Sequence, residues 1–472
     1  YTTTLIVKML ALGLNKLASF DPFQVGLEMD AGKPGWCDAV NGLPGILGSS
    51  VCEVFALQRL FRQMTTVLEK MPNEEIHIPV EIVTLLQGLF AKLQTLPKTQ
   101  AEHYDFWRES HALRDLYLRE TRLGLSGKET SQTASQLMRF IEAAQSLVAG
   151  AILRANCRES GIYHTYLYHQ VTQWKVLEEG NEDGSIRVWP EAFVQRSLPN
   201  FLEGQVHALR LEKDPQKAQA LYEAVRQSDL FDDKLAMYKV SADLTESPYE
   251  VGRIRVFPRG WLENESVFLH MEYKYLLEIL RSGLYDDFFA ELPRLLVCYA
   301  KPEIYGRNPL ENCSFIVTSC NPRTELHGNG FIARLSGSTA EMLHIWLVMS
   351  FGEHPFRLGD EDQLELAMAP ILTPAFFTTD AQEINVQWWN GQSRSYRIPK
   401  DAYVAKFLGK TLAVYHNPNR KPTFGTDPAR IVRITLSQWD GTEAHFEGAT
   451  LAGEWADKVR RGLVERIDFE ME

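Results

Sequence analysis

Residues 32–45 read GKPGWCDAVNGLPG and hold four glycines and two prolines. Glycine adopts backbone angles that other residues avoid, whereas proline fixes φ and removes a hydrogen-bond donor, so this density excludes a regular helix or a central strand. The stretch is therefore predicted to be a loop. It lies between two segments with helical periodicity, residues 3–19 and 49–71. Loops held by rigid neighbours commonly carry binding and catalytic groups, and we expect the chain to be organised around this one.

Trp36 and Asp38 place a flat apolar ring beside a carboxyl group in this loop. A carboxyl beside such a ring suits a sugar ring held near an acid, so Asp38 is a candidate general acid toward a glycosidic oxygen. An inverting hydrolase would need a second carboxylate about 6.5–9.5 Å away to activate water. The carboxylates that could supply it are Glu28, Asp30, Glu53 and Glu263. The alternative is a tight connector in which Asp38 only caps a turn.

The overall composition limits the possible partners. The chain has 472 residues and a formal net charge of −12. Because nucleic acids and anionic membranes require a basic footprint, we expect no nucleic acid and no membrane as partners. Six cysteines without metal-ligand spacing favour free thiols and no bound metal. No signal-peptide pattern is present, which favours a cytoplasmic location. The chain begins at Tyr1 with a helical pattern already under way, so we expect it to be cut from a longer protein.

Helical periodicity dominates the first third of the chain and alternation dominates its end. Further helices are predicted over residues 79–96, 101–125 and 133–156, and such helix pairs pack as bundles, solenoids or closed double-helical barrels. Residues 161–211 are predicted to be a β excursion, with strands at 163–176, 185–189 and 205–211. From residue 362 onward the pattern predicts strands to the end of the chain.

Two further segments carry candidate anion ligands. His270 lies early in a predicted helix over residues 267–281, and Ser336-Gly337 open the helix that ends near residue 349. Free N–H groups and the dipole at a helix start favour an anion, so these residues could hold phosphate. The alternatives are a structural histidine and a simple helix cap. His327, between turns rich in glycine, could contact a sugar hydroxyl or only stabilise its loop.

Three stretches, in this order, resemble the inverting glycoside phosphorylases of the cellobiose phosphorylase family, and most closely the long-chain members acting on β-1,2- or β-1,3-oligoglucans. They are GKPGWCDAVNGLPG (32–45), WLENESVFLHMEYKYL (261–276) and HGNGFIARLSGSTAEML (327–343).

The resemblance implies roles for particular residues. Asp38 falls on the family's general acid, and His270, Ser336 and Gly337 fall on its phosphate site, where Ser-Gly replaces the more usual Thr-Gly. The residues expected to contact sugar are Trp36, Asn41, Trp261, Glu263 and His327. Inorganic phosphate would be a co-substrate, and no other cofactor is expected.

The resemblance also implies a mainly α fold: part of an (α/α)6 barrel built from helix pairs, followed by a C-terminal all-β domain. The expected boundaries are 1–360 for the barrel portion, with a helical and β insertion at about 79–211, and 361–472 for the β domain. The expected partners are an oligosaccharide or β-glucan, phosphate, the missing N-terminal part of the parent chain, and a second copy in a homodimer.

The function implied is inverting phosphorolysis of a β-linked glucan or oligosaccharide to an α-sugar 1-phosphate. Two alternatives stay open. One is an inverting β-glucan hydrolase, and the other is a non-catalytic sugar-binding fragment, which would describe an isolated chain that lacks part of its barrel.

Overall fold

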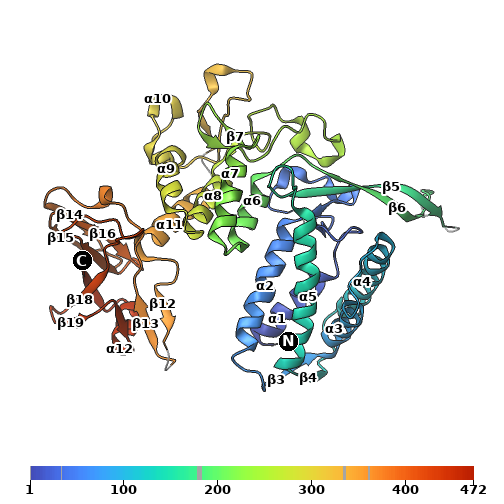
Figure 1. Ribbon diagram of the computed structural model, residues 1–472, viewed down its shortest axis with the longest axis horizontal. Coiled ribbons are helices and arrows are strands. Elements are labelled where there is room, and N and C mark those ends of the chain that lie inside the picture. Colours follow the sequence, from blue (N-terminus) through green and yellow to red (C-terminus); the bar gives the residue numbers. More distant parts are fainter. Residues whose placement is uncertain (1, 33–34, 178–182, 333–335, 360–361) are drawn as a thin grey trace. The chain divides into compact units, whose positions relative to one another are not determined.

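The computed structural model describes residues 2–32, 35–177, 183–332, 336–359 and 362–472 (Figure 1). The chain divides into two compact units, the first formed by Tyr1–Leu284 with Ala290–Ser338 and the second by Tyr285–Phe289 with Thr339–Glu472. The domain boundary expected between residues 360 and 361 falls outside the described residues. None of the helices in the described ranges is long and apolar enough to cross a bilayer.

Helices supply most of the first unit. They are α1 (Leu5–Leu17), α2 (Cys52–Leu68), α3 (Val80–Leu93), α4 (Gln100–Thr121), α5 (Ala134–Ala155), α6 (Leu202–Leu211), α7 (Pro215–Arg226), α8 (Leu269–Arg281) and α10 (Pro302–Tyr305). Two more, α9 (Tyr285–Leu295) and α11 (Ser336–Phe351), have residues in both units. The long helices α4 and α5 begin with capping boxes, in which Thr99 pairs with Glu102 and Thr133 with Gln136.

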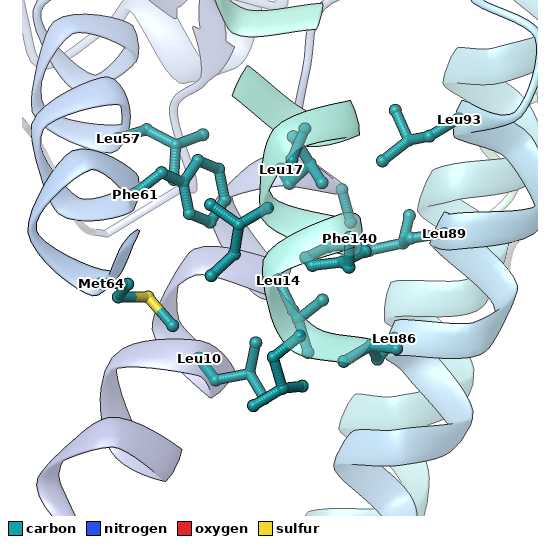
Figure 2. Packing of buried hydrophobic residues seen from close by; sticks show 14 of the residues in the cluster. Leu10, Leu14, Leu17, Leu57, Phe61, Met64, Leu86, Leu89, Leu93 and Phe140 are labelled. Carbon is teal, nitrogen blue, oxygen red and sulfur yellow. The ribbon is translucent and has the colours of Figure 1, made fainter. Parts of the chain in front are cut away.

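A hydrophobic core joins α1, α2, α3 and α5. Side chains three or four residues apart share one face of a helix, and the apolar positions of these four helices meet in this way (Figure 2). The labelled members are Leu10, Leu14 and Leu17 from α1, Leu57, Phe61 and Met64 from α2, Leu86, Leu89 and Leu93 from α3, and Phe140 from α5. All of them are at most 5% exposed, so this is a well-packed core.

Small sheets lie among these helices. Their strands are β1 (Leu27–Glu28), β2 (Ser49–Ser50), β3 (Glu75–Pro79), β4 (Glu129–Thr133), β5 (Tyr166–Val176), β6 (Val188–Ser197), β7 (Phe231–Asp232), β8 (Met237–Tyr238), β9 (Val267–Phe268), β10 (Phe315–Ile316) and β11 (Gly330–Phe331). One sheet has the order β1-β2-β5-β6, and its β5–β6 hairpin extends away from the helices (Figure 1). The sheet β11-β10-β9 leads directly into α8.

The second unit is mainly β. Its elements are β12 (Phe356–Leu358), β13 (Leu364–Ala367), β14 (Gln382–Gln387), β15 (Ser393–Ile398), β16 (Ala402–Phe407), β17 (Thr411–His416), β18 (Ile431–Gln438), β19 (Glu443–Glu447), β20 (Thr450–Ala452), α12 (Glu454–Arg461) and β21 (Val464–Met471). The largest sheet has the order β16-β17-β21-β18-β19, with β17 and β21 parallel. The hairpin β14–β15 turns near Asn390-Gly391, where Gly391 takes a φ of 79°.

The predicted fold class, a mainly α portion of an (α/α)6 barrel with an all-β C-terminal domain, is wrong. The structure is 40% helix and 23% strand, and its strands form many small sheets, several of them inside the helical part. The strand β4 is polar throughout and carries no alternating signal, and the alternation of β3 (EIHIP) covers only five residues. Residues 205–211, predicted as a strand, belong to helix α6, and the β-rich unit contains α12.

Candidate functional site

The loop that carries Asp38 is fastened to a second loop far along the chain. The amide N–H of Gly42 donates to Val251 O at 3.0 Å, and that of Arg253 donates to Asn41 Oδ1 at 3.1 Å. The two backbones approach so closely that a Cβ on Gly42 would lie 1.9 Å from Glu250 O, which explains the glycine. The loop is therefore held in a fixed position.

Asp38 opens the short 3-10 helix η1 (Asp38–Val40) and is exposed, while its neighbours Cys37 and Ala39 are buried. Buried neighbours fix the backbone on either side, so the carboxyl group presents to solvent from a defined position. Residues 33–34 and 333–335, which belong to two of the three motifs, lie outside the described residues.

Trp36 lies two residues before Asp38, and its ring packs against residues of a distant segment. Its ring packs against Phe268 at 4.8 Å between centroids, and the His270 ring meets it edge-on at 5.5 Å. Trp36 is half-buried, so part of the indole remains accessible. The structure thus brings the predicted sugar-stacking residue into contact with a predicted phosphate ligand.

His270 lies between Trp36 and the start of α11. Strand β9 runs into α8, and this places the imidazole in the first turn of the helix. An added Cβ on Gly337 would lie 2.6 Å from His270 Nδ1, so the absence of a side chain makes room for the ring. Ser336 opens α11 and is exposed. His270, Ser336 and Gly337 therefore form one local group at a helix N-terminus, where free N–H groups favour an anion.

Glu263 is the predicted carboxylate that lies within electrostatic reach of Asp38. Burial raises the pKa of Glu263, its own backbone N–H and the charge of Arg253 lower it, and the charge of Asp38 raises it by a smaller amount. Glu263 therefore favours its protonated form more than a free glutamate does. Asp38 could then act as the general acid while Glu263 makes a polar contact to the sugar.

The other carboxylates that could have served a hydrolase have partners elsewhere. Glu28 accepts hydrogen bonds from Trp107 Nε1 at 2.7 Å and pairs with His111 Nε2 at 2.8 Å. Asp30 pairs with Arg114, and Glu53 pairs with Lys16. These interactions tie the three side chains to α4 and α1.

Three predicted sugar contacts are engaged within the protein. Trp261 stacks on Phe331 with centroids 3.8 Å apart and an interplanar angle of 5°, which covers one face of the indole. His327 uses both ring nitrogens, since Nδ1 lies 2.7 Å from Lys234 Nζ and Nε2 lies 2.7 Å from Asn321 O. Asn41 is exposed, but its Oδ1 holds the Arg253 amide. These interactions within the protein give all three residues a structural role.

A buried polar cluster lies behind the Asp38 loop. Cys52, Glu203 and His207 place donor atoms within 4.8 Å of one another, and Tyr166 donates its hydroxyl hydrogen to Glu203. Burial raises the pKa of Glu203 to about 7, and burial together with Lys274, Arg210 and Arg59 lowers the pKa of His207 to about 4. Sequence reasoning missed this cluster because the spacing of Glu203 and His207 is informative only if residues 202–211 form a helix.

The donor set of this cluster could ligate a transition metal, since thiolate, carboxylate and imidazole are common zinc ligands. The charges around it oppose that use. The same cations that lower the pKa of His207 would repel a dication, and Glu203 already accepts a hydrogen bond from Tyr166. The cluster is better suited to holding a proton than a metal ion.

No family model and no curated protein matches this chain. Among solved structures it is similar to an uncharacterized conserved protein from Thermus thermophilus, with a TM-score of 0.27, 11% identity, and coverage of 73% of this chain and 92% of that one. A GH63 mannosylglycerate hydrolase from the same organism, in complex with glucose, gives a TM-score of 0.26 with the same identity and coverage. Scores this low do not establish a shared fold.

Proposed function

We propose that this chain acts on glycosidic bonds, as an inverting glycoside phosphorylase that converts a β-linked glucan or oligosaccharide to an α-sugar 1-phosphate. The observation that carries the proposal is the contact of His270 with both Trp36 and Gly337. This contact joins a surface suited to a sugar ring with a helix start suited to phosphate, and Asp38 follows Trp36 by two residues in the same loop.

In the proposed reaction Asp38 donates its proton to the glycosidic oxygen as the bond from that oxygen to the anomeric carbon breaks. A phosphate oxygen, with the anion held by His270, Ser336 and the N–H of Gly337, attacks the anomeric carbon from the opposite face. The new carbon–oxygen bond has the α configuration. Because phosphate is already a nucleophile, no carboxylate is needed to activate water, in contrast to an inverting hydrolase.

The proposal is tested in the direction of synthesis. The protein is incubated with α-glucose 1-phosphate and a panel of β-linked glucose oligomers, and the release of orthophosphate is measured. We expect release with at least one acceptor and its loss, by about a hundredfold or more, in Asp38→Asn. Equal release of orthophosphate by the wild type and Asp38→Asn would show that Asp38 is not the general acid.

A second candidate is an inverting hydrolase, which one observation favours. Asp38 and Glu263 interact electrostatically, and a hydrolase requires a pair of carboxylates. In that case free sugar would appear without phosphate, and Glu263→Gln would abolish its formation. For the phosphorylase, Glu263→Gln should alter sugar binding while product formation still depends on phosphate.

A further inference from the structure

A cavity of about 710 Å³ opens on the first unit between α2, the end of α5 and the end of α6. It shares no residue with the group around Asp38 and His270. Its volume falls in the range of about 300–1,000 Å³ that is usual for small-molecule sites.

Four cationic side chains line this cavity: Arg62, Arg158, Lys213 and Lys217. None of them takes part in an ion pair within the part of the chain that the structure describes. Arg62 Nη1 donates to Leu211 O at 3.0 Å, which fixes the guanidinium at the wall and leaves its other N–H groups for a ligand. The chain has a net charge of −12, so these four cations make a locally basic patch on an acidic protein.

A single carboxylate, that of Glu212, also lines the cavity. Its Oε1 accepts hydrogen bonds from the backbone N–H groups of Lys213 at 2.8 Å and Asp214 at 2.9 Å. The Asp214 carboxylate caps α7 by accepting from the Gln216 N–H at 2.9 Å. The acidic groups at this end of α6 are therefore occupied by backbone amides, and the basic groups keep an excess of positive charge.

Gln58 provides an independent sign of a ligand. It lines the cavity, its side chain is only 8% exposed, and its Oε1 is buried without a hydrogen-bond partner among the described residues. A buried acceptor left unsatisfied costs about 1–3 kcal/mol, and a turn of the Gln58 amide toward the cavity would let a ligand hydroxyl satisfy it. Tyr163, whose ring meets the buried Phe55 ring edge-on at 5.3 Å, adds an apolar wall beside it.

We propose that this cavity binds a small phosphorylated, hydroxyl-bearing molecule of the sugar phosphate class. Arg62, Arg158 and the two lysines hold the phosphate group, Gln58 Oε1 accepts from a hydroxyl, and the ring lies against Tyr163. The inference does not depend on the proposed reaction, since it uses none of the same residues.

The test is isothermal titration of the whole chain with glucose 6-phosphate, inorganic phosphate and glucose. Glucose 6-phosphate should bind at least about tenfold more tightly than either inorganic phosphate or glucose, because only it uses both parts of the cavity. Its binding should persist in His270→Ala, which separates this site from the proposed phosphate site. Equal affinity for glucose 6-phosphate and inorganic phosphate would overturn the assignment to a sugar phosphate, and so would no binding at all.

Variants locate the site. Arg158→Ala with Lys217→Ala should weaken glucose 6-phosphate by about tenfold or more, because two charge-assisted contacts are lost. The matched control, Arg119→Ala with Lys128→Ala, removes two exposed cations away from the cavity and should leave affinity unchanged. Gln58→Leu should weaken glucose 6-phosphate but not inorganic phosphate. Wild-type affinity in the Arg158/Lys217 variant would overturn the proposal even if Gln58→Leu failed to fold.

Discussion

Gly337 leaves the space that the imidazole of His270 occupies, since an added Cβ would lie 2.6 Å from Nδ1 and 2.8 Å from Cε1. Contacts this short force the ring to move. In the proposed reaction that ring holds phosphate, so its position should affect the use of phosphate more than the stability of the fold.

Gly337→Ala should therefore raise the KM for phosphate by about tenfold, equivalent to losing one charge-assisted hydrogen bond, while changing the melting temperature little. Alanine suits a helix start at least as well as glycine, so the helix itself should not be weakened. Gly45→Ala is the matched control, because a Cβ there meets nothing within 4 Å. An unchanged KM for phosphate in Gly337→Ala would show that the ring does not contact it.

Glu203 makes the stability of the folded protein depend on pH. Its pKa is raised by burial from the ordinary value of 4.5 to about 7, so the folded protein holds this proton more tightly than the unfolded chain. The stabilisation is complete below about pH 4.5 and is lost as the pH rises through about 7. The difference in pKa corresponds to about 3 kcal/mol.

Glu203→Gln removes this titration and should keep the acceptor for Tyr166. The variant's free energy of unfolding, relative to that of the wild type, should rise by about 3 kcal/mol between about pH 4.5 and pH 8 in urea titrations. The pKa of His207 is lowered to about 4, so its contribution to stability is lost as the pH falls below about 6.5. This loss occurs in both proteins, so the difference between them reports Glu203. Parallel pH profiles for the two proteins would show that Glu203 is ionised in the fold.

The elements that sequence periodicity predicts best are the amphipathic helices. Helices α1, α2, α3, α4 and α5 have clear patterns or caps, and the structure contains helices in those places. Helix α6 was missed because it is buried on most sides, so it lacks the polar face that makes a helix recognisable. The strand β4 is polar throughout, so its sequence does not reveal the backbone hydrogen bonds by which it pairs with β3.

Two leucines of α1 test this account of the helical core. Leu14 is fully buried in the core that joins α1, α2, α3 and α5, while Leu12, on the same helix, is 54% exposed. Leu14→Ala should lower the free energy of unfolding by about 2–5 kcal/mol through lost burial and a cavity. Leu12→Ala should change it by about 0.5 kcal/mol or less, as measured by chemical denaturation. Similar losses for the two variants would contradict the packing described here.

At the scale of the whole molecule, the candidate site combines residues that are far apart in sequence. Three segments supply these residues, which are Trp36, Glu263, His270 and Gly337. The order of the three motifs predicted that they belong together, because it resembles the order in a known family. Periodicity could not supply the contacts between them, because it reports which face of an element is apolar and not where two distant loops meet. The residues of the Glu203 cluster and of the basic cavity lie outside the three motifs, so only the three-dimensional structure shows that they lie together.

The central claim is that phosphate, and not water, attacks the sugar when Asp38 gives up its proton. The most direct measurement is the proton NMR spectrum of the products formed from a β-linked glucose oligomer with and without inorganic phosphate. We expect α-glucose 1-phosphate only when phosphate is present, and neither α-glucose 1-phosphate nor the shortened oligomer in Asp38→Asn. Free glucose appearing at the same rate in both buffers would contradict it.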